Sequence, residues 1–401
     1  MKNSKIISRF NYLYVALILL WSPLQSTVIT FDGKGRIRLA LTLMAFIINS
    51  NRATFKKILF SKPVALWFIW CLFVTVSTYI QGYMNPSLPF LYFTVNNVFC
   101  PCMIMAVCAY EYLKSPKKFL KTILLVFLVY AFIGTFVMDI GYVALEAGKM
   151  NANTLGNLLA LNVMLIIFFI GVRYCRKEMS LTSAIALIVF AIGIVVVSAT
   201  RKALGASVIM IISIILSQVK FTFSNILKII LPTIVLYYGF IFMMGNTKMG
   251  ERMGELEEQT DIVETRYNIG DNAFLKAMGD RAPHYILGYE VFKDNPVAGI
   301  GLSNFMRKTG YPSVLHTEYM VQLCECGIIG SILFVMFYWS IIKMLLKKMR
   351  LGKFERPMAI IMLGTVVALL FIYLTAWSYS FPFYFAVLGT IVGFIHSKET
   401  R

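Results

Sequence analysis

The chain has 401 residues, of which 59% are hydrophobic and only 14% are charged, and its mean hydropathy is +0.74. This composition excludes an ordinary soluble globular domain and indicates an all-α protein that crosses a lipid bilayer several times. The net charge of +19 would suggest a nucleic-acid partner in a soluble protein, but the basic residues lie mainly in short gaps between apolar segments, which excludes that partner here.

Apolar stretches of near-spanning length recur along the chain and predict about twelve transmembrane helices. The second and eighth stretches are short, and only Arg201 and Lys202 separate the seventh from the eighth. No small-residue cleavage signal follows the first stretch, so we expect a retained helix rather than a signal peptide. The stretches cover residues 11–30, 36–50, 62–81, 88–110, 119–140, 154–172, 180–200, 203–219, 225–244, 318–342, 357–376 and 380–396.

The basic residues predict the orientation of these helices. If the N-terminus is cytoplasmic, the segments on the inner side hold 24 Lys and Arg residues, whereas the short outer loops hold six. Because positive charge collects on the cytoplasmic side of membrane proteins, both termini are expected in the cytoplasm.

One long hydrophilic interval, residues 245–317, then falls outside the cytoplasm. It holds ten of the nineteen acidic residues, and its own charge balance and turns predict a small helical cap rather than a linker. Within it, residues 281–294 predict a surface helix, and the following Pro-Val-Ala-Gly-Ile-Gly run predicts a tight turn. The predicted organisation is therefore helices 1–9 over residues 1–244, the cap over 245–317, and helices 10–12 over 318–401.

Several common motifs are missing from the sequence. It contains no Walker loop, no Gly-x-Gly-x-x-Gly after a strand, no Asp-x-Asp pair and no zinc-ligand spacing. We therefore expect no cytosolic nucleotide donor, no cofactor and no metal.

Arg201 and Lys202 interrupt an apolar run at or just above membrane depth. Charges at that depth are costly and commonly functional, although an interfacial turn between two helices would also accommodate them. The functional interpretation is favoured for Arg201, and for Lys202 the two interpretations are balanced.

Two further candidates lie around the cap. Arg281 precedes the turn and can reach a phosphate, although its position beside Asp280 alone favours a solvated arginine. His316 lies where water meets lipid, and a neutral imidazole there can accept a proton from a sugar hydroxyl, although a lone histidine is more often structural. Glu318 and Glu325 are rival bases, while Gly327 and Gly330, one helical turn apart, are typical of helix packing.

Together and in this order, these elements resemble the O-antigen ligase/polymerase family of bacterial membrane glycosyltransferases, most strongly over residues 195–342. In that family a histidine is followed by Asn, Ser or Gln, nine residues, Gly, two residues, and a small residue or Tyr. Thr317 departs from the usual second residue but keeps a hydrogen-bonding side chain. The residues that match this pattern are His316, Thr317, Gly327 and Gly330. The family also shows an arginine followed by an Asn-Pro-x-x-Gly-x-Gly turn, which is matched by Arg281, Asn295, Pro296, Gly299 and Gly301. Weaker matches are Thr200 with Arg201, and Asn153.

The resemblance implies a metal-independent, inverting transfer from an undecaprenyl-diphosphate-linked glycan outside the bacterial inner membrane. It assigns the diphosphate to Arg201 and Arg281 and the acceptor sugar to His316. The supporting residues it implies are Lys202, Asn153, Thr317, Glu318 and Glu325.

Two activities fit this resemblance, and a third function fits the helices alone. A polymerase of repeat units is favoured because only fourteen residues separate Gly301 from His316; a ligase that transfers the glycan to lipid A core is the alternative. A flippase or other transporter also fits twelve helices, but it would carry ionisable groups at the midplane of several helices. Besides the lipid-linked glycan and membrane lipids, a chain-length regulator and a flippase are the expected partners.

Overall fold

The computed structural model describes residues 2–27, 34–83, 89–132, 152–198, 201–218, 272–278, 281–352, 355–376, 379 and 381–397. These residues form helices and no strand, so the predicted all-α class is confirmed over them. The ninth predicted stretch, 225–244, and the part of the predicted cap at 245–271 lie outside the described residues.

Four described helical segments are long and apolar enough to cross a membrane: α4 (Lys62–Ile80), Phe90–Lys114, α18 (Gly327–Met349) and α19 (Glu355–Ile372). These segments indicate a multi-pass membrane protein, and the number of twelve spans stays a prediction. Shorter apolar segments lie in α1 (Lys2–Thr27), α2 (Lys34–Ser50), α9 (Ala152–Cys175), α10 (Leu181–Ser198), α11 (Arg201–Gln218) and α20 (Pro382–His396), and the fifth predicted stretch coincides in part with α7 (Pro116–Phe132).

The chain forms two compact units, neither of which is continuous in sequence. The first unit comprises Met1–Val126, Pro283–Met344 and Tyr373–Arg401, and the second comprises Phe127–Ala282 and Leu345–Ile372. These units are defined by which helices pack together. The predicted boundaries at residues 244 and 317 instead separate hydrophilic from membrane segments, and they stay a prediction.

Aromatic packing joins three helices of the first unit. The Trp67 ring of α4 lies 4.8 Å from the Phe337 ring of α18 and 5.0 Å from the Phe385 ring of α20, measured between ring centroids. Trp67 also stacks on Trp70 at 4.5 Å, and both indoles are buried. Large buried rings in such contacts hold α4, α18 and α20 together. The other elements of this unit include α3 (Ala53–Leu59), α5 (Phe90–Phe93), η1 (Thr94–Phe99) and α6 (Cys100–Lys114).

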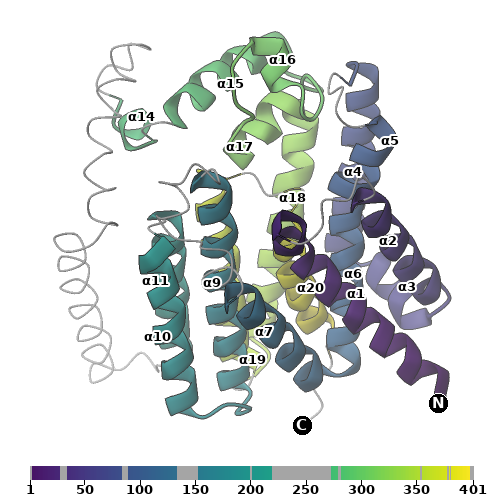
Figure 1. Cartoon of the computed structure of the whole chain (residues 1–401), viewed down its shortest axis with the longest axis vertical. Coiled ribbons are helices and arrows are strands. Elements are labelled where there is room, and N and C mark those ends of the chain that lie inside the picture. The colour runs from purple at the N-terminus through teal and green to yellow at the C-terminus, as the bar shows by residue number, and fades with distance from the viewer. Residues whose placement is uncertain are drawn as a thin grey trace. The chain divides into compact units, whose positions relative to one another are not determined.

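In the second unit α9, α10, α11 and α19 lie side by side, with α11 against both α9 and α19 (Figure 1). Their sequences are almost entirely apolar over the buried parts, as a helix surrounded by other helices and lipid requires. The short helix α14 (Ala273–Met278) also belongs to this unit.

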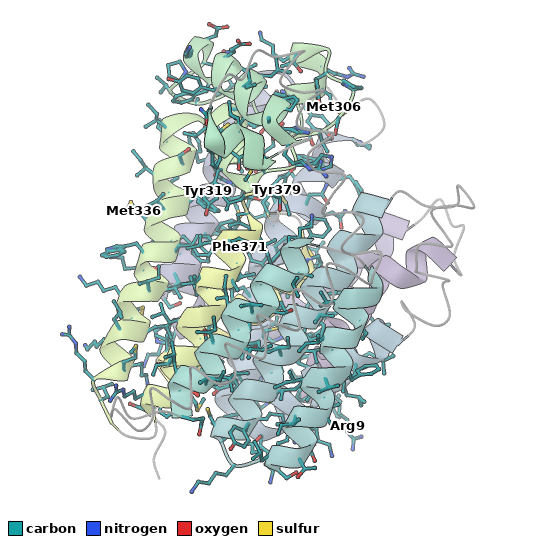
Figure 2. The ribbon with its side chains drawn as sticks, turned by 90° about the vertical axis from the view of Figure 1, so that its left-hand side faces the viewer. Arg9, Met306, Tyr319, Met336, Phe371 and Tyr379 are labelled. Atoms are coloured by element: carbon teal, nitrogen blue, oxygen red, sulfur yellow. The ribbon has the colours of Figure 1, made fainter. Side chains whose placement is uncertain are left out.

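Short elements of the first unit gather at one end of α18, at the top of Figure 1: α15 (Ala282–Asp294), α16 (Phe305–Thr309) and α17 (Glu318–Met320). Helix α15 matches the helix predicted over 281–294. In Figure 2, Met306 and Tyr379 also lie toward this end, and Arg9 lies toward the opposite one. This end of the unit carries the candidate site.

The tenth predicted stretch, 318–342, is not one regular helix. It comprises α17, the π-helix η4 (Val321–Glu325), and then α18, which begins at Gly327 with a φ of +66°. Hydropathy averaged over the length of a membrane helix does not reveal this break, because apolar residues dominate the stretch as a whole. The fourth stretch is likewise divided, by the π-helix η1, and such π segments are frequent at functional sites.

Candidate functional site

The glycine-rich loop after α15 lies backbone-to-backbone against the start of α18. The amide of Ile300 donates to the carbonyl of Cys324 at 3.0 Å, and the amide of Gly301 donates to the carbonyl of Glu325 at 2.9 Å. In return, the amide of Ile328 donates to the carbonyl of Pro296 at 2.8 Å. The two halves of the sequence motif, which fourteen residues separate in the chain, therefore form one hydrogen-bonded structure.

This close approach explains two of the motif glycines. A Cβ on Gly299 would lie 2.4 Å from the carbonyl carbon and oxygen of Glu325, and one on Gly327 would lie 2.5 Å from the amide nitrogen of Gly299. Both residues also have positive φ, +68° and +66°. Any side chain at either position would push the loop off the helix. A Cβ on Gly330 would lie 2.3 Å from the Cβ of Cys326 and 3.3 Å from the Phe73 ring of α4. The helix-packing role predicted for Gly327 and Gly330 stays a prediction.

The same loop is bonded to the end of α4. The hydroxyl of Ser77 donates to the carbonyl of Ala298 at 2.8 Å, and the hydroxyl of Thr78 accepts the amide of Leu302 at 2.9 Å. The buried Asn304 side chain donates to the carbonyl of Gly82 at 3.0 Å. The loop is thus held between α4 and α18 and forms a rigid base for the segment that follows it.

His316 lies in the extended segment between α16 and α17, and it is half-buried. Its Nε2 lies 2.9 Å from the hydroxyl of Ser313, which also lies 3.2 Å from the carbonyl oxygen of Val314. When the hydroxyl donates to Val314, its oxygen accepts Nε2–H, and the lone pair of the neutral ring is then on Nδ1. The contact with Ser313 therefore positions one ring nitrogen of His316.

Thr317, the departure from the family pattern, is completely buried. Its hydroxyl lies 3.1 Å from the Tyr285 hydroxyl and 3.2 Å from the carbonyl of Tyr373. The Tyr285 hydroxyl in turn donates to the carbonyl of Leu374 at 2.7 Å. Thr317 therefore ties the His316 segment to α15 and to the segment after α19, a hydrogen-bonding role that a threonine can fill.

Glu318 is buried and bonded on both carboxylate oxygens. One accepts the side-chain amide of Gln322 at 2.7 Å, and the other accepts the backbone amide of Tyr379 at 3.3 Å. The Trp70 indole donates to Gln322 at 2.9 Å and extends this network into α4. These bonds fit a structural carboxylate better than a base that receives a proton from substrate.

Glu325, the other rival base, is 4% exposed and accepts the amide of Phe305 at 3.3 Å. A cavity of about 30 Å³, lined by its carboxylate, Ser303, Tyr379 and apolar side chains, has room for about one or two water molecules. Burial raises the pKa of Glu325 from 4.5 to about 7, against the lowering effect of the Ser303 and Phe305 backbone, and the charge of Glu318 adds to the rise. This carboxyl precedes α18 and can change its charge near neutral pH.

The raised pKa of Glu325 predicts a pH-dependent stability. The pKa of Glu325 is higher in the folded protein than in the unfolded chain. The contribution of the protonated Glu325 carboxyl to the free energy of unfolding is therefore complete below pH 4.5 and is lost as the pH rises through 7. The Glu325→Gln variant carries no charge, so at pH 8 it should be more stable than the wild type by up to about 3 kcal/mol. Thermal unfolding in detergent between pH 4.5 and 8 measures this difference, and Glu290→Gln, on the exposed face of α15, is the control. A Glu325→Gln variant that is less stable at pH 8 would contradict the argument.

The cationic candidates lie in the second unit. Arg281 directly precedes α15 and is 9% exposed, which argues against the solvated arginine favoured by composition. Arg201 and Lys202 are the first two residues of α11, and Lys202 is half-buried, while Asn153 lies in the first turn of α9; the side chains of Arg201 and Asn153 lie outside the described residues. The convergence of Arg201 and Arg281 with His316 on one diphosphate therefore stays a prediction.

Sequence reasoning missed His284. Its ring lies 5.2 Å from the His316 ring, centroid to centroid, at an interplanar angle of 75°. His284 is one of only three histidines in the chain, and it lies three residues after Arg281, so its rarity and position were the available signals. Sequence reasoning also missed Ser313 and Tyr379, which resemble ordinary loop residues until the fold brings them to the site.

Comparison with known proteins supports this interpretation. Residues 186–335 match a family model described as O-antigen ligase, and this range includes Arg201, Arg281, His316 and both glycine pairs. No curated protein matches the chain. The family match covers less than half of the chain, and over these residues it confirms the predicted resemblance to the O-antigen ligase/polymerase family.

Proposed function

We propose that this protein is a membrane glycosyltransferase that joins undecaprenyl-diphosphate-linked repeat units into an O-antigen, capsular or exopolysaccharide. The observation that carries the proposal is the placement of His316. The family's glycines dock one loop on the start of α18, and the segment that follows this loop presents the imidazole, with its Nε2 bonded to Ser313. This docked loop supports the proposal that the His316 imidazole is the proton acceptor of the reaction.

The reaction needs little beyond a base and a place for negative charge. The oxygen of the acceptor sugar hydroxyl attacks the anomeric carbon of the donor, the bond from that carbon to the lipid diphosphate breaks, and the configuration inverts. His316 takes the hydroxyl proton, and the bond electrons leave with the diphosphate. Because diphosphate is already a good leaving group, cations on its oxygens supply most of the remaining stabilisation.

Arg201 and Arg281 are the cations proposed for that role. Arg201 and Lys202 begin a helix, where positive side chains are unfavourable because the helix dipole is itself positive at that end. An anion bound there would remove this cost and could also accept hydrogen bonds from backbone amides of the first turn. Guanidinium groups bind phosphate oxygens through two parallel hydrogen bonds, which suits a diphosphate. Lys202 and Asn153 are assigned supporting positions.

The positive charge of the predicted inner segments supports a site on the extracytoplasmic face of the bacterial inner membrane, with both termini in the cytoplasm. On that face the protein would receive its donor from a flippase and would work beside a chain-length regulator. Labelling of single cysteines placed beside His316 and near residue 398, from one side of sealed vesicles, tests this orientation.

The direct test is a reaction in lipid nanodiscs with the purified protein and a defined undecaprenyl-diphosphate oligosaccharide, with and without a chelator. We expect lipid-linked products that grow by whole repeat units, in equal amounts with the chelator. Absence of any glycan transfer would refute the proposed function, and chelator-sensitive transfer would refute its metal independence.

The description of the matching family as O-antigen ligase favours a second candidate activity, transfer of the finished glycan to lipid A core. The two activities differ in what accumulates when the gene is deleted. Single-repeat glycans indicate a polymerase, whereas long lipid-linked chains that lack core attachment indicate a ligase. The short segment from Gly301 to His316 favours the polymerase.

Substitution of Arg201 or Arg281 should lower the rate of glycan transfer more than substitution of a nearby lysine. Arg201→Ala and Arg281→Ala should each lower the rate of glycan transfer by about 100-fold or more, because each removes a donor from the developing negative charge. Lys202→Ala should have a smaller effect. Lys293→Ala is the control, since Lys293 is exposed on α15 and lies over the Tyr289 ring. Initial rates in the nanodisc assay measure the change, and near-normal rates for both arginine variants would remove them from the site.

A further inference from the structure

His284 is a buried imidazole surrounded by aromatic rings. It is 2% exposed, and its ring centroid lies 5.2 Å from that of His316, 5.3 Å from that of Tyr311 and 6.4 Å from that of Phe305. The contacts with His316 and Tyr311 are edge-to-face, at interplanar angles of 75° and 77°. Edge-to-face is a favoured geometry for such rings, and it fixes the orientation of one ring relative to the other.

The chain backbones that carry the two histidines are tied together beside this contact. Tyr285 follows His284, Thr317 follows His316, and the two hydroxyls are 3.1 Å apart. Tyr285 also donates to the carbonyl of Leu374, and the amide of Glu318 donates to the carbonyl of Tyr373 at 3.0 Å. This buried hydrogen-bond network fixes the two backbone segments, and with them the two rings, relative to one another.

We propose that His284 is a positioning residue for His316, an inference that rests on the proposed function. The Ser313 hydroxyl holds the His316 ring at Nε2, and the His284 ring holds it at its face or edge, so the two contacts together define the plane of the imidazole. A base must be held in such a plane for its lone pair to meet the proton of the acceptor hydroxyl.

Two substitutions of His284 distinguish the packing of its ring from the chemistry of its ring nitrogens. His284→Ala removes the contact, and His284→Phe keeps an aromatic ring of similar size without ring nitrogens. We expect His284→Ala to lower kcat by roughly 10- to 100-fold, with the KM for the lipid donor unchanged, because a misplaced base slows transfer without weakening donor binding. His284→Phe should restore most of kcat. The control is His396→Ala, which alters the last residue of α20 and should leave both constants unchanged.

Three results would overturn the proposal. Wild-type kcat in His284→Ala would show that the contact does not matter for turnover. A His284→Phe variant as slow as His284→Ala would show that a ring nitrogen, not ring packing, is required. A His284→Ala variant with a raised KM and normal kcat would place the residue in donor binding.

A readout independent of activity keeps this inference apart from the proposed function. With labelled histidine, the full-length protein in nanodiscs gives NMR signals from three histidines, which single substitutions assign. His284→Ala should shift the His316 signals and leave those of His396 in place. An unchanged His316 signal would refute the positioning role even if glycan transfer occurs, whereas a shifted signal without any glycan transfer would refute only the proposed function.

Discussion

Replacement of His316 with alanine is expected to lower the rate of glycan transfer by about 10²- to 10⁴-fold, the usual contribution of a positioned general base. The side chain is half-buried, and the bond that it makes to Ser313 involves a partly exposed hydroxyl. Its removal should therefore leave the fold intact, because the buried bonds of Thr317 and Glu318 hold the segment independently. The measurement is the initial rate of repeat-unit transfer in nanodiscs, compared at equal amounts of folded protein.

Two companion variants sharpen this test. Ser313→Ala should cause a smaller loss than His316→Ala, because the imidazole stays in place and loses only one of its contacts. His396→Ala should transfer glycan at the wild-type rate. Near-normal transfer by His316→Ala would exclude the proposed base and direct attention to Glu325, the buried carboxyl beside the small cavity.

The sequence predicted the helical class and the positions of most helices because apolar length is a local property of the chain. The helices α4, α9, α10, α11, α19 and α20 all fall on predicted stretches. The break before Gly327 could not be predicted this way. It results from contacts with Val297 and Gly299, which approach from another part of the chain, and hydropathy carries no information about such contacts.

The candidate site shows the same limit. Motif spacing singled out Gly299, Gly327 and His316, but it could not distinguish a glycine that packs helices from one that receives a loop. His284 has no motif around it, and only its burial beside His316 distinguishes it from an ordinary helix residue. The sequence offered Glu318 and Glu325 alike as candidate bases. In the fold their surroundings differ, because Glu318 accepts hydrogen bonds from a side-chain and a backbone amide, whereas Glu325 lines a cavity.

Alanine at Gly299 or Gly327 is expected to destabilise the docked loop by about 3 kcal/mol or more and to abolish glycan transfer. At both positions the new Cβ would lie within 2.6 Å of backbone atoms, which cannot rotate away as a side chain can. Because His316 follows this loop in the chain, a displaced loop would also misplace the imidazole. Loss of thermal stability in detergent, measured together with the transfer rate, tests both consequences.

Gly310 provides the matched control for this prediction. It has a φ of +69°, almost the same as Gly299 and Gly327, but nothing lies within 4 Å of a Cβ built on it. Gly310→Ala therefore carries only the cost of left-handed backbone, about 1 to 2 kcal/mol, without the clash. If Gly299→Ala and Gly327→Ala lose no more stability than Gly310→Ala, backbone docking is not what these glycines provide. A double variant tests this coupling. Because a Cβ on Gly299 would meet the backbone just before Gly327, and a Cβ on Gly327 would meet the backbone of Val297 and Gly299, the combined loss of stability should be smaller than the sum of the single losses.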